Sequence, residues 1–347
     1  MAFTWSTAGR PLVALAPMAG VTDASYRQFI KKIAPETIVY TEFLSTDALA
    51  YGAKKTLQMM HFDPAIERPF IVQVFGHKAE HFLEAAKIIE QMGADGIDIN
   101  MGCPAAKVVS SCHGAALIKE PQLAAELVHA TCKAVSIPVS VKTRLGWDKK
   151  EGLFEFCQGL VDAGAQALAI HGRRFCDKFG GKADWEPIYE LKRRVNVPVI
   201  GNGDISSAKD AVEKIGNLDG VMVGRGTFGN PWLMAEIVDA FGIAKPESQI
   251  AKDPSRFALR DSQFSRPRTF QEKLPFILEH CELAVRHKGE MIGMREMRRH
   301  LASYVKGFEG ASAMRSKLMT VETLRETKEI LGSYDLVPCQ LSVPAGV

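Results

Sequence analysis

The sequence predicts an α/β fold, a (β/α)₈ TIM barrel followed by a smaller all-helical C-terminal domain. Eight short, apolar, β-branched runs recur over residues 12–225, and segments of helical character lie between them. Strands that are buried on both faces of a parallel sheet have such near-continuous apolar sequences. A closed barrel fits these units better than an open doubly wound sheet, because no Gly-x-Gly-x-x-Gly turn follows the first run.

The expected strands begin 22 to 42 residues apart. They are Leu12–Pro17, Ile38–Phe43, Phe70–Phe75, Gly96–Met101, Pro138–Thr143, Ala167–Gly172, Pro198–Gly203 and Gly220–Arg225. Helices are expected between them, among others over Glu80–Met92, Leu123–Val135 and Leu153–Ala163. Gly93 and Gly164 follow two of these helices directly, which is where glycine ends helices.

Composition indicates an ordinary globular protein. The chain has 347 residues, of which 46% are hydrophobic and 24% charged, and this length allows one large and one smaller domain. No apolar run reaches the roughly 18 residues that span a bilayer, and the N-terminus lacks the features of a signal peptide. The seven cysteines have no regular spacing and no Cys-x-x-Cys pair. We therefore expect a cytoplasmic protein with reduced thiols and no metal.

Polar side chains lie at the carboxyl ends of seven expected strands. The carboxyl ends of parallel barrel strands meet at one rim, and the barrel interior is normally packed with aliphatic residues. Polar strand ends therefore predict one pocket at this rim. The residues concerned are Glu42, Gln73, Asn100, Lys142, His171, Asn202 with Asp204, and Arg225.

The last two strands predict a phosphate site. They end in Gly201-Asn202-Gly203-Asp204 and Gly224-Arg225-Gly226, where glycines let backbone N–H groups approach an anion. Barrels commonly bind phosphate after these two strands. Two tight turns with a structural arginine are the alternative. With Gln73, Lys142 and His171 across the barrel, the phosphate site favours a flavin mononucleotide, whose isoalloxazine edge Gln73 and Lys142 can contact.

Cys103 follows the fourth expected strand, between Gly102 and Pro104. A thiol beside a flavin can be a nucleophile, a redox partner or a general acid. Its ordinary pKa of about 8.5 keeps it mostly protonated at neutral pH, which favours proton donation. Cys112 and His113 lie in the same loop, but adjacent residues seldom face each other, so we expect no nucleophilic dyad.

Seven motifs together resemble the tRNA-dihydrouridine synthases, most closely their bacterial DusB branch, over about residues 11–330. They are residues 16–23 (APMAGVTD), 72–76 (VQVFG), 98–104 (DINMGCP), 139–147 (VSVKTRLGW), 170–173 (IHGR), 202–205 (NGDI) and 224–226 (GRG). One stretch departs from the family pattern. Residues 110–113 (SSCH) precede Gly114-Ala115-Ala116-Leu117 where the family usually has a small, glycine-rich segment.

The resemblance implies a reaction and its residues. NADPH reduces FMN, and the reduced flavin passes a hydride to C6 of a uracil flipped out of the tRNA D-loop. Cys103 would protonate C5, and Asn100 would lie beside the substrate base. Arg144 and Arg173 would contact RNA or the flavin phosphate. The flavin would be lined by Pro17, Met18, Gln73, Lys142, His171, Asn202, Gly203, Asp204, Gly224 and Arg225.

The C-terminal part is basic. Residues 240–347 carry 17 basic and 13 acidic side chains, against 26 and 27 in residues 1–239. On charge alone this is a solvated helix face or a surface for a polyanion. The resemblance favours a tRNA-binding surface with Arg295, Arg298 and Arg299. We thus expect an FMN-binding catalytic domain over 1–240, a linker over 241–270, a helical tRNA-binding domain over 271–335 and a tail over 336–347.

Two other functions remain open at this point. A flavin barrel that acts on a small pyrimidine, like a dihydroorotate or dihydropyrimidine dehydrogenase, would share the pocket and the loop cysteine but would not need the basic helices. A non-catalytic RNA-binding barrel would not need Cys103, Lys142 and the phosphate site together. We expect a monomer, because the rim and the basic helices must stay free for RNA.

Overall fold

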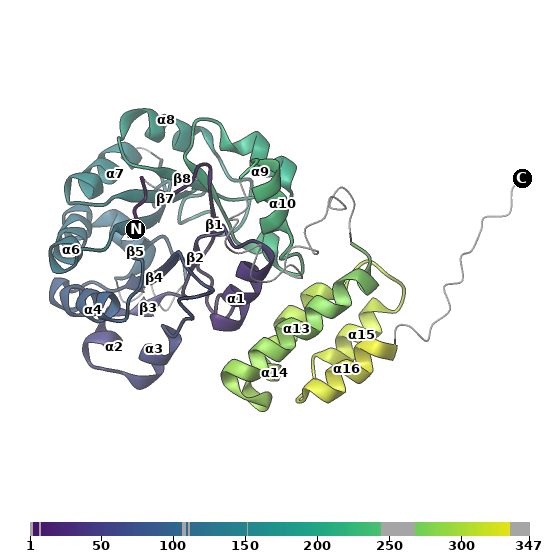
Figure 1. The fold of residues 1–347 in the computed structure, drawn as a ribbon. Helices are drawn as coiled ribbons and strands as arrows, with labels where there is room; N and C mark the ends of the chain where they lie inside the picture. The colour runs from purple at the N-terminus through teal and green to yellow at the C-terminus, as the bar shows by residue number, and fades with distance from the viewer. Residues whose placement is uncertain are drawn as a thin grey trace, which may run out of the picture. The chain divides into compact units, whose positions relative to one another are not determined.

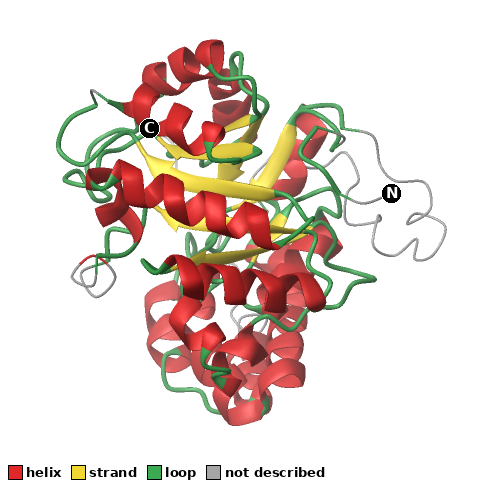
Figure 2. Ribbon diagram, turned by 90° about the vertical axis from the view of Figure 1, so that its left-hand side faces the viewer, coloured by secondary structure: helices red, strands yellow, loops and turns green. Residues whose placement is uncertain are grey.

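The computed structural model describes residues 3–6, 8–105, 109, 112–150, 152–243 and 268–333. The chain forms two compact units, Met1–Gln263 and Phe264–Val347. The first unit holds a parallel sheet surrounded by helices, and the second consists of helices (Figures 1 and 2). Most of the expected linker over 241–270, and the expected tail over 336–347, lie outside the described residues.

The sheet of the first unit is a barrel, as predicted. Its strands lie side by side in the order β1-β9-β8-β7-β6-β5-β4-β2, and β3 also pairs with β4. All of these strand pairs are parallel. The ring closes because the Leu15 N–H donates to the Ile38 carbonyl and the Ile38 N–H donates to the Val13 carbonyl, both at 2.9 Å. The strands are β1 (Leu12–Leu15), β2 (Val39–Tyr40), β3 (Leu44–Ser45), β4 (Phe70–Phe75), β5 (Gly96–Met101), β6 (Val139–Arg144), β7 (Ala167–His171), β8 (Val199–Asn202) and β9 (Gly220–Val223). Of the second expected strand, Ile38–Phe43, only β2 forms, and β3 begins one residue after its predicted end.

Helices cover the outside of this barrel (Figure 2). The three helices expected by residue number occur within two residues of their predicted ends, as α4, α6 and α7. Side-chain caps begin several of the helices: the Asp23 carboxylate accepts from the Tyr26 N–H at 2.9 Å, and Ser207 forms a capping box with Asp210. The helices are α1 (Ala24–Ile33), α2 (Thr46–Ala50), α3 (Lys54–Met59), α4 (Ala79–Gln91), η1 (Gly114–Lys119), α6 (Pro121–Ala134), α7 (Leu153–Asp162), α8 (Glu186–Arg194), α9 (Ala208–Ile215), η2 (Arg225–Thr227) and α10 (Leu233–Ala240).

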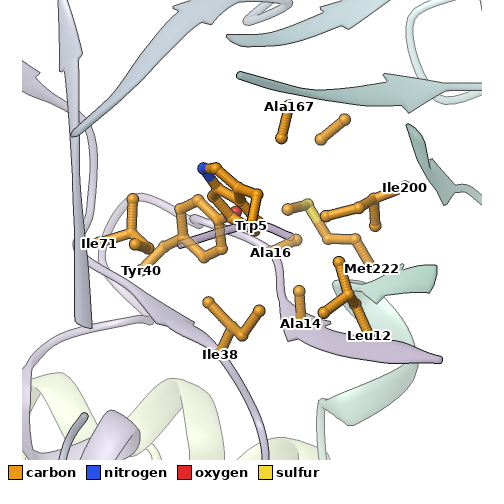
Figure 3. Close-up of a cluster of buried hydrophobic side chains, with 11 residues drawn as sticks. Trp5, Leu12, Ala14, Ala16, Ile38, Tyr40, Ile71, Ala167, Ile200 and Met222 are labelled. Atoms are coloured by element: carbon orange, nitrogen blue, oxygen red, sulfur yellow. The ribbon is translucent and has the colours of Figure 1, made fainter. Parts of the chain in front are cut away.

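Apolar side chains fill the barrel interior (Figure 3). Trp5, which precedes the first strand, is only 2% exposed and packs into this cluster with Tyr40, Ile71 and Met222. Trp5 also borders a second cavity with Pro138 and other residues that precede the strands, so it closes the amino end of the barrel. The polar side chains at the strand ends line a different cavity, at the carboxyl end of the barrel.

The second unit is a small helical bundle with α13 (Phe270–Lys288), α14 (Glu290–Tyr304), α15 (Ala311–Leu318) and α16 (Leu324–Gly332). Capping boxes of Thr269 with Glu272 and of Thr323 with Glu326 begin its first and last helices. Helices α13 and α14 pack closely at Gly293, where a Cβ atom would lie 2.6 Å from the Ala284 carbonyl oxygen. No described helix is long and apolar enough to cross a membrane.

A buried ion pair fixes α1 to the segment before β4. Arg27 Nε lies 2.7 Å from Glu67 Oε2, and both side chains are 0% exposed. Gln28 Nε2 and the Asp63 N–H donate to the other Glu67 oxygen at 3.0 and 2.9 Å. The Arg27 guanidinium also donates to the carbonyls of Thr22 and His61. Because the guanidinium and the carboxylate both have hydrogen-bond partners, the free-energy cost of burying the two charges is largely offset.

We predict that Glu67→Gln lowers the free energy of unfolding of the barrel by about 3–5 kcal/mol, because it leaves the Arg27 charge buried without a counter-ion. Urea denaturation followed by tryptophan fluorescence measures this, since all four tryptophans lie in the first unit. Lys87→Ala, at the exposed pair with Glu84, is the control and should cost less than about 1 kcal/mol. Equal losses in the two variants would contradict the role assigned to the buried pair.

Candidate functional site

A cavity of about 700 Å³ opens at the carboxyl rim of the barrel. This is within the size range of small-molecule and cofactor sites. Thirteen of the fourteen barrel residues proposed as catalytic, cofactor-binding or substrate-binding line it. These are Pro17, Met18, Gln73, Asn100, Cys103, Lys142, Arg144, His171, Asn202, Gly203, Asp204, Gly224 and Arg225.

Arg173, the fourteenth, does not line the cavity. Its guanidinium donates to both Asp204 carboxylate oxygens at 2.8 Å and to the carbonyls of Gly180 and Gly181. It therefore supports the wall of the pocket from behind. Glu42 is also absent from the lining, and its carboxylate accepts from the Gly20 N–H.

Sequence reasoning missed several lining residues, among them Phe43, Lys178, Phe179 and Ser206. Phe179 is 55% exposed and lies on the loop after β7, with the guanidinium carbons of Arg144 and Arg225 at 5.7 and 5.1 Å from its ring centre. Phe179 could have been recognised in the sequence, because it is an aromatic residue in an otherwise polar, glycine-containing loop.

A hydrogen-bond chain runs along the floor of the cavity to Cys103. Gln73 Nε2 donates to the Asp98 carboxylate at 2.7 Å, and Asn100 Nδ2 donates to Gln73 Oε1 at 2.9 Å. Asn100 Oδ1 accepts from the backbone N–H groups of Gly102 and Cys103 at 3.1 and 2.9 Å. Side chains from the carboxyl-terminal halves of β4 and β5 thus fix the turn that carries the cysteine.

Asp98 anchors this chain from a position that is 0% exposed. Burial raises the pKa of its carboxyl to about 6, against hydrogen bonds from Ser140 and Gln73 and the charge of Lys142, which favour ionisation. The carboxylate is therefore ionised at neutral pH and accepts from both donors.

The Cys103 thiol is half-buried. Burial raises its pKa above the usual value, although a backbone hydrogen bond at Ala105 and the charges of Arg144 and Lys142 act in the opposite direction. The thiol therefore carries its proton at neutral pH. Arg144 Nε donates to the Gly102 carbonyl at 2.7 Å and so braces the same turn. Residues 106–108, 110 and 111 of the loop lie outside the described residues.

Lys142 and His171 face the cavity in different charge states. Lys142 Nζ donates to Asn202 Oδ1 at 3.2 Å, and Asn202 Nδ2 donates to the Met222 carbonyl at 2.7 Å. Burial lowers the pKa of Lys142 to about 8, with Arg144 acting in the same direction, so the ammonium is mostly charged at pH 7. Burial, followed by the charges of Lys142 and Arg144, lowers the pKa of His171 far below its usual range and keeps the ring neutral.

The β8 and β9 ends form a cationic, glycine-rich edge of the cavity. The Arg225 side chain is 59% exposed, and its Nη2 lies 3.9 Å from Asp204 Oδ1. Asp204 has a φ of 49°, which few non-glycine residues adopt. A Cβ atom at Gly224 would lie 3.4 Å from Ala16 Cβ and would fill space at the cavity wall. The edge can therefore bind an anionic group such as a phosphate.

The three arginines proposed for RNA lie on α14 of the second unit. Arg295 and Arg299 are exposed. Arg298 differs, because its guanidinium donates to the carbonyls of Val321 and Thr320 at 2.9 and 3.1 Å. Arg298 thus connects α14 to the segment before α16.

We predict that Asp98→Asn changes how the stability of the barrel depends on pH. A carboxyl with a raised pKa in the folded state favours folding when protonated, and this contribution is lost as pH rises from its unfolded value near 4 to about 6. The unfolding free energy of the native chain, relative to the variant, should therefore fall by up to about 1.4 kcal/mol per pH unit over this window. Urea titrations between pH 4 and pH 8 measure it. Parallel curves for the two proteins would contradict a raised pKa of Asp98 in the folded state.

Comparison with known proteins identifies close relatives. The family model described as "Dihydrouridine synthase (Dus)" matches residues 14–336. The "Probable tRNA-dihydrouridine synthase 1" of Synechocystis sp. is 37% identical over 319 residues, 91% of this chain and 84% of that protein. The "tRNA-dihydrouridine synthase B" of Pseudomonas syringae pv. tomato is 35% identical over 314 residues, which cover 89% of this chain and 86% of that protein.

Among solved structures, a "2-Naphthoyl-CoA Reductase-2-Naphthoyl-CoA complex" is similar with a TM-score of 0.49 and 12% identity. The match covers 92% of this chain and 67% of that one.

Proposed function

The chain belongs to the dihydrouridine synthase family, and from this we propose that it reduces specific uridines of the tRNA D-loop to 5,6-dihydrouridine, with FMN as cofactor and NADPH as reductant. The observation that carries the proposal is the position of Cys103. Its protonated thiol lines the same cavity as Asn100 and Lys142, and the cationic edge around Arg225 borders that cavity as well.

The residues of the cavity fit a flavin mononucleotide. Arg225 and the turns at Gly203 and Gly224 would hold its phosphate. Gln73 and Lys142 would contact the polar edge of the ring system, where the Lys142 ammonium favours negative charge. His171 stays neutral beside these cations, so its ring can accept a hydrogen bond without adding charge.

When bound and reduced, FMN would supply a hydride from N5 to C6 of the uracil. Cys103 Sγ delivers its proton to C5, so that the C5=C6 double bond becomes a single bond and the base stays neutral. The resulting thiolate lies near Arg144 and Lys142, whose charges favour it, and it takes a proton back from water. Asn100 Nδ2 has two N–H donors, of which the bond to Gln73 uses one. We assign the other to a uracil carbonyl.

Arg295 and Arg299 on α14 support RNA as the substrate. Exposed arginines bind phosphates and provide most of the affinity for RNA without reading its sequence. A barrel that acts on a small pyrimidine has no need of such a surface. Arg298 is bonded to backbone carbonyls of its own unit, so its replacement would disturb the bundle as well as any RNA contact.

We predict that Cys103→Ala retains NADPH-dependent flavin reduction but lowers dihydrouridine formation by about 10²–10⁴-fold, because the proton donor is lost. Flavin absorbance measures the first step and mass spectrometry of digested tRNA the second. Cys176→Ala, which removes an exposed cysteine outside the cavity lining, is the matched control and should keep both activities. Full dihydrouridine formation by Cys103→Ala would contradict the role of Cys103 as the acid.

We predict that Arg295→Glu with Arg299→Glu weakens tRNA binding and reduces the slope of log K against log salt concentration by about one to two, because phosphate contacts are lost. Fluorescence anisotropy with labelled tRNA at several salt concentrations measures both. Arg325→Glu with Lys328→Glu reverses two exposed cations on α16 of the same unit and controls for net charge. If this control weakens binding as much as the α14 variant, α14 is not the RNA surface.

A further inference from the structure

We propose that His113 is a positioning residue for Cys103, because it fastens the end of the cysteine loop to the β4–α4 connection through a hydrogen bond with His77. His113 Nε2 lies 2.5 Å from His77 Nδ1, and the ring centres are 4.7 Å apart. This inference rests on the proposed function only in that Cys103 is taken to be the catalytic acid. The contact between the two histidines does not depend on that function.

The histidine pair lies between two connections at the barrel rim. His77 lies two residues after the end of β4, and His113 immediately precedes η1. His113 is 8% exposed, and its ring also meets the Phe75 ring edge-on with 5.5 Å between centres. A largely buried imidazole with a ring partner and a hydrogen-bond partner has a defined position, which an unanchored loop end would lack.

The position of His113 is transmitted to Cys103 through the backbone. The Ala115 N–H, two residues after His113, donates to the Cys103 carbonyl at 3.2 Å. The other side of Cys103 is held by the bond from its N–H to Asn100 Oδ1. The cysteine is thus fixed from both directions, by the floor of the cavity and by the His113 segment.

Two imidazoles can share one hydrogen bond only while at least one ring nitrogen is an acceptor, so double protonation replaces attraction by repulsion. Burial, followed by the charge of His77, lowers the pKa of His113, and the nearby Asp47 acts in the opposite direction. The other ionisable groups near the pair are His81, which bonds Asp47 at 2.6 Å, and Lys78. The fastened state therefore loses stability as pH falls below about 6.5, the ordinary pKa of a free histidine.

Four variants of the full chain test this inference: His113→Ala, His77→Ala, His77→Asn and, as the matched control, His129→Ala on the exposed face of α6. The asparagine variant can place an amide nitrogen or oxygen near the position of His77 Nδ1, so it can keep a hydrogen bond to His113 without titrating. The readout is the protection of the Ala115 amide against hydrogen exchange, at pH 7.5 and pH 5.5, corrected for the intrinsic effect of pH.

At pH 7.5 we expect the protection of Ala115 to fall about tenfold in both alanine variants and to stay within about threefold of the native value in His77→Asn and His129→Ala. At pH 5.5 the native chain should lose protection, whereas His77→Asn should retain it. Unchanged protection in His113→Ala, or equal losses at pH 5.5 in the native chain and His77→Asn, would overturn the inference.

Activity provides a second, separate readout. His113→Ala should lower the rate of dihydrouridine formation several-fold with unchanged flavin reduction by NADPH, because Cys103 is less well placed. A native protein that forms no dihydrouridine would refute the proposed function and leave the exchange result intact as the test of the histidine contact. Full dihydrouridine formation by His113→Ala would overturn its positioning role.

Discussion

The buried carboxylate of Asp98 is the interaction on which the site depends. It accepts from Gln73 and Ser140, and from Gln73 the hydrogen bonds continue through Asn100 to the backbone of Gly102 and Cys103. Each amide in this chain has one donor end and one acceptor end, and an ionised carboxylate only accepts. All the bonds therefore point in the same direction, from the cysteine turn to Asp98. These bonds thereby hold side chains from separate strands, and the turn with Cys103, in one fixed arrangement at the barrel rim.

The rest of the cavity is an arrangement of cations around that anchored floor. Lys142 and Arg144 approach Cys103, and Arg225 lies at the glycine-rich edge. Burial keeps His171 neutral and lowers the pKa of Lys142 without discharging it at pH 7. A pocket with this charge suits an anionic cofactor, and the half-buried thiol beside it keeps its proton. The positions of these residues and their protonation states thus both fit flavin-dependent reduction with Cys103 as the proton donor.

The sequence predicts the barrel because buried parallel strands leave a strong local pattern, and β4 and β5 begin and end at their predicted residues. Polar lining residues such as Gln73, Asn100 and Lys142 could be predicted as well, because a polar side chain near the carboxyl end of a barrel strand lies at the rim. The break between β2 and β3, at residues 41–43, leaves no such pattern. The pairing of His77 with His113, 36 residues apart and in loops, is set by tertiary packing alone. The orientation of Arg173 behind Asp204 is likewise a tertiary effect.

The most direct test of the central claim is an anaerobic single turnover. The flavin of the purified protein is reduced with NADPH, and the reduced protein is then mixed either with an unmodified tRNA transcript or with orotate. The account predicts that tRNA restores the absorbance of the oxidised flavin and gains dihydrouridine in its D-loop, whereas orotate leaves the flavin reduced. Reoxidation by orotate or another free pyrimidine, with no reaction of the tRNA, would contradict it.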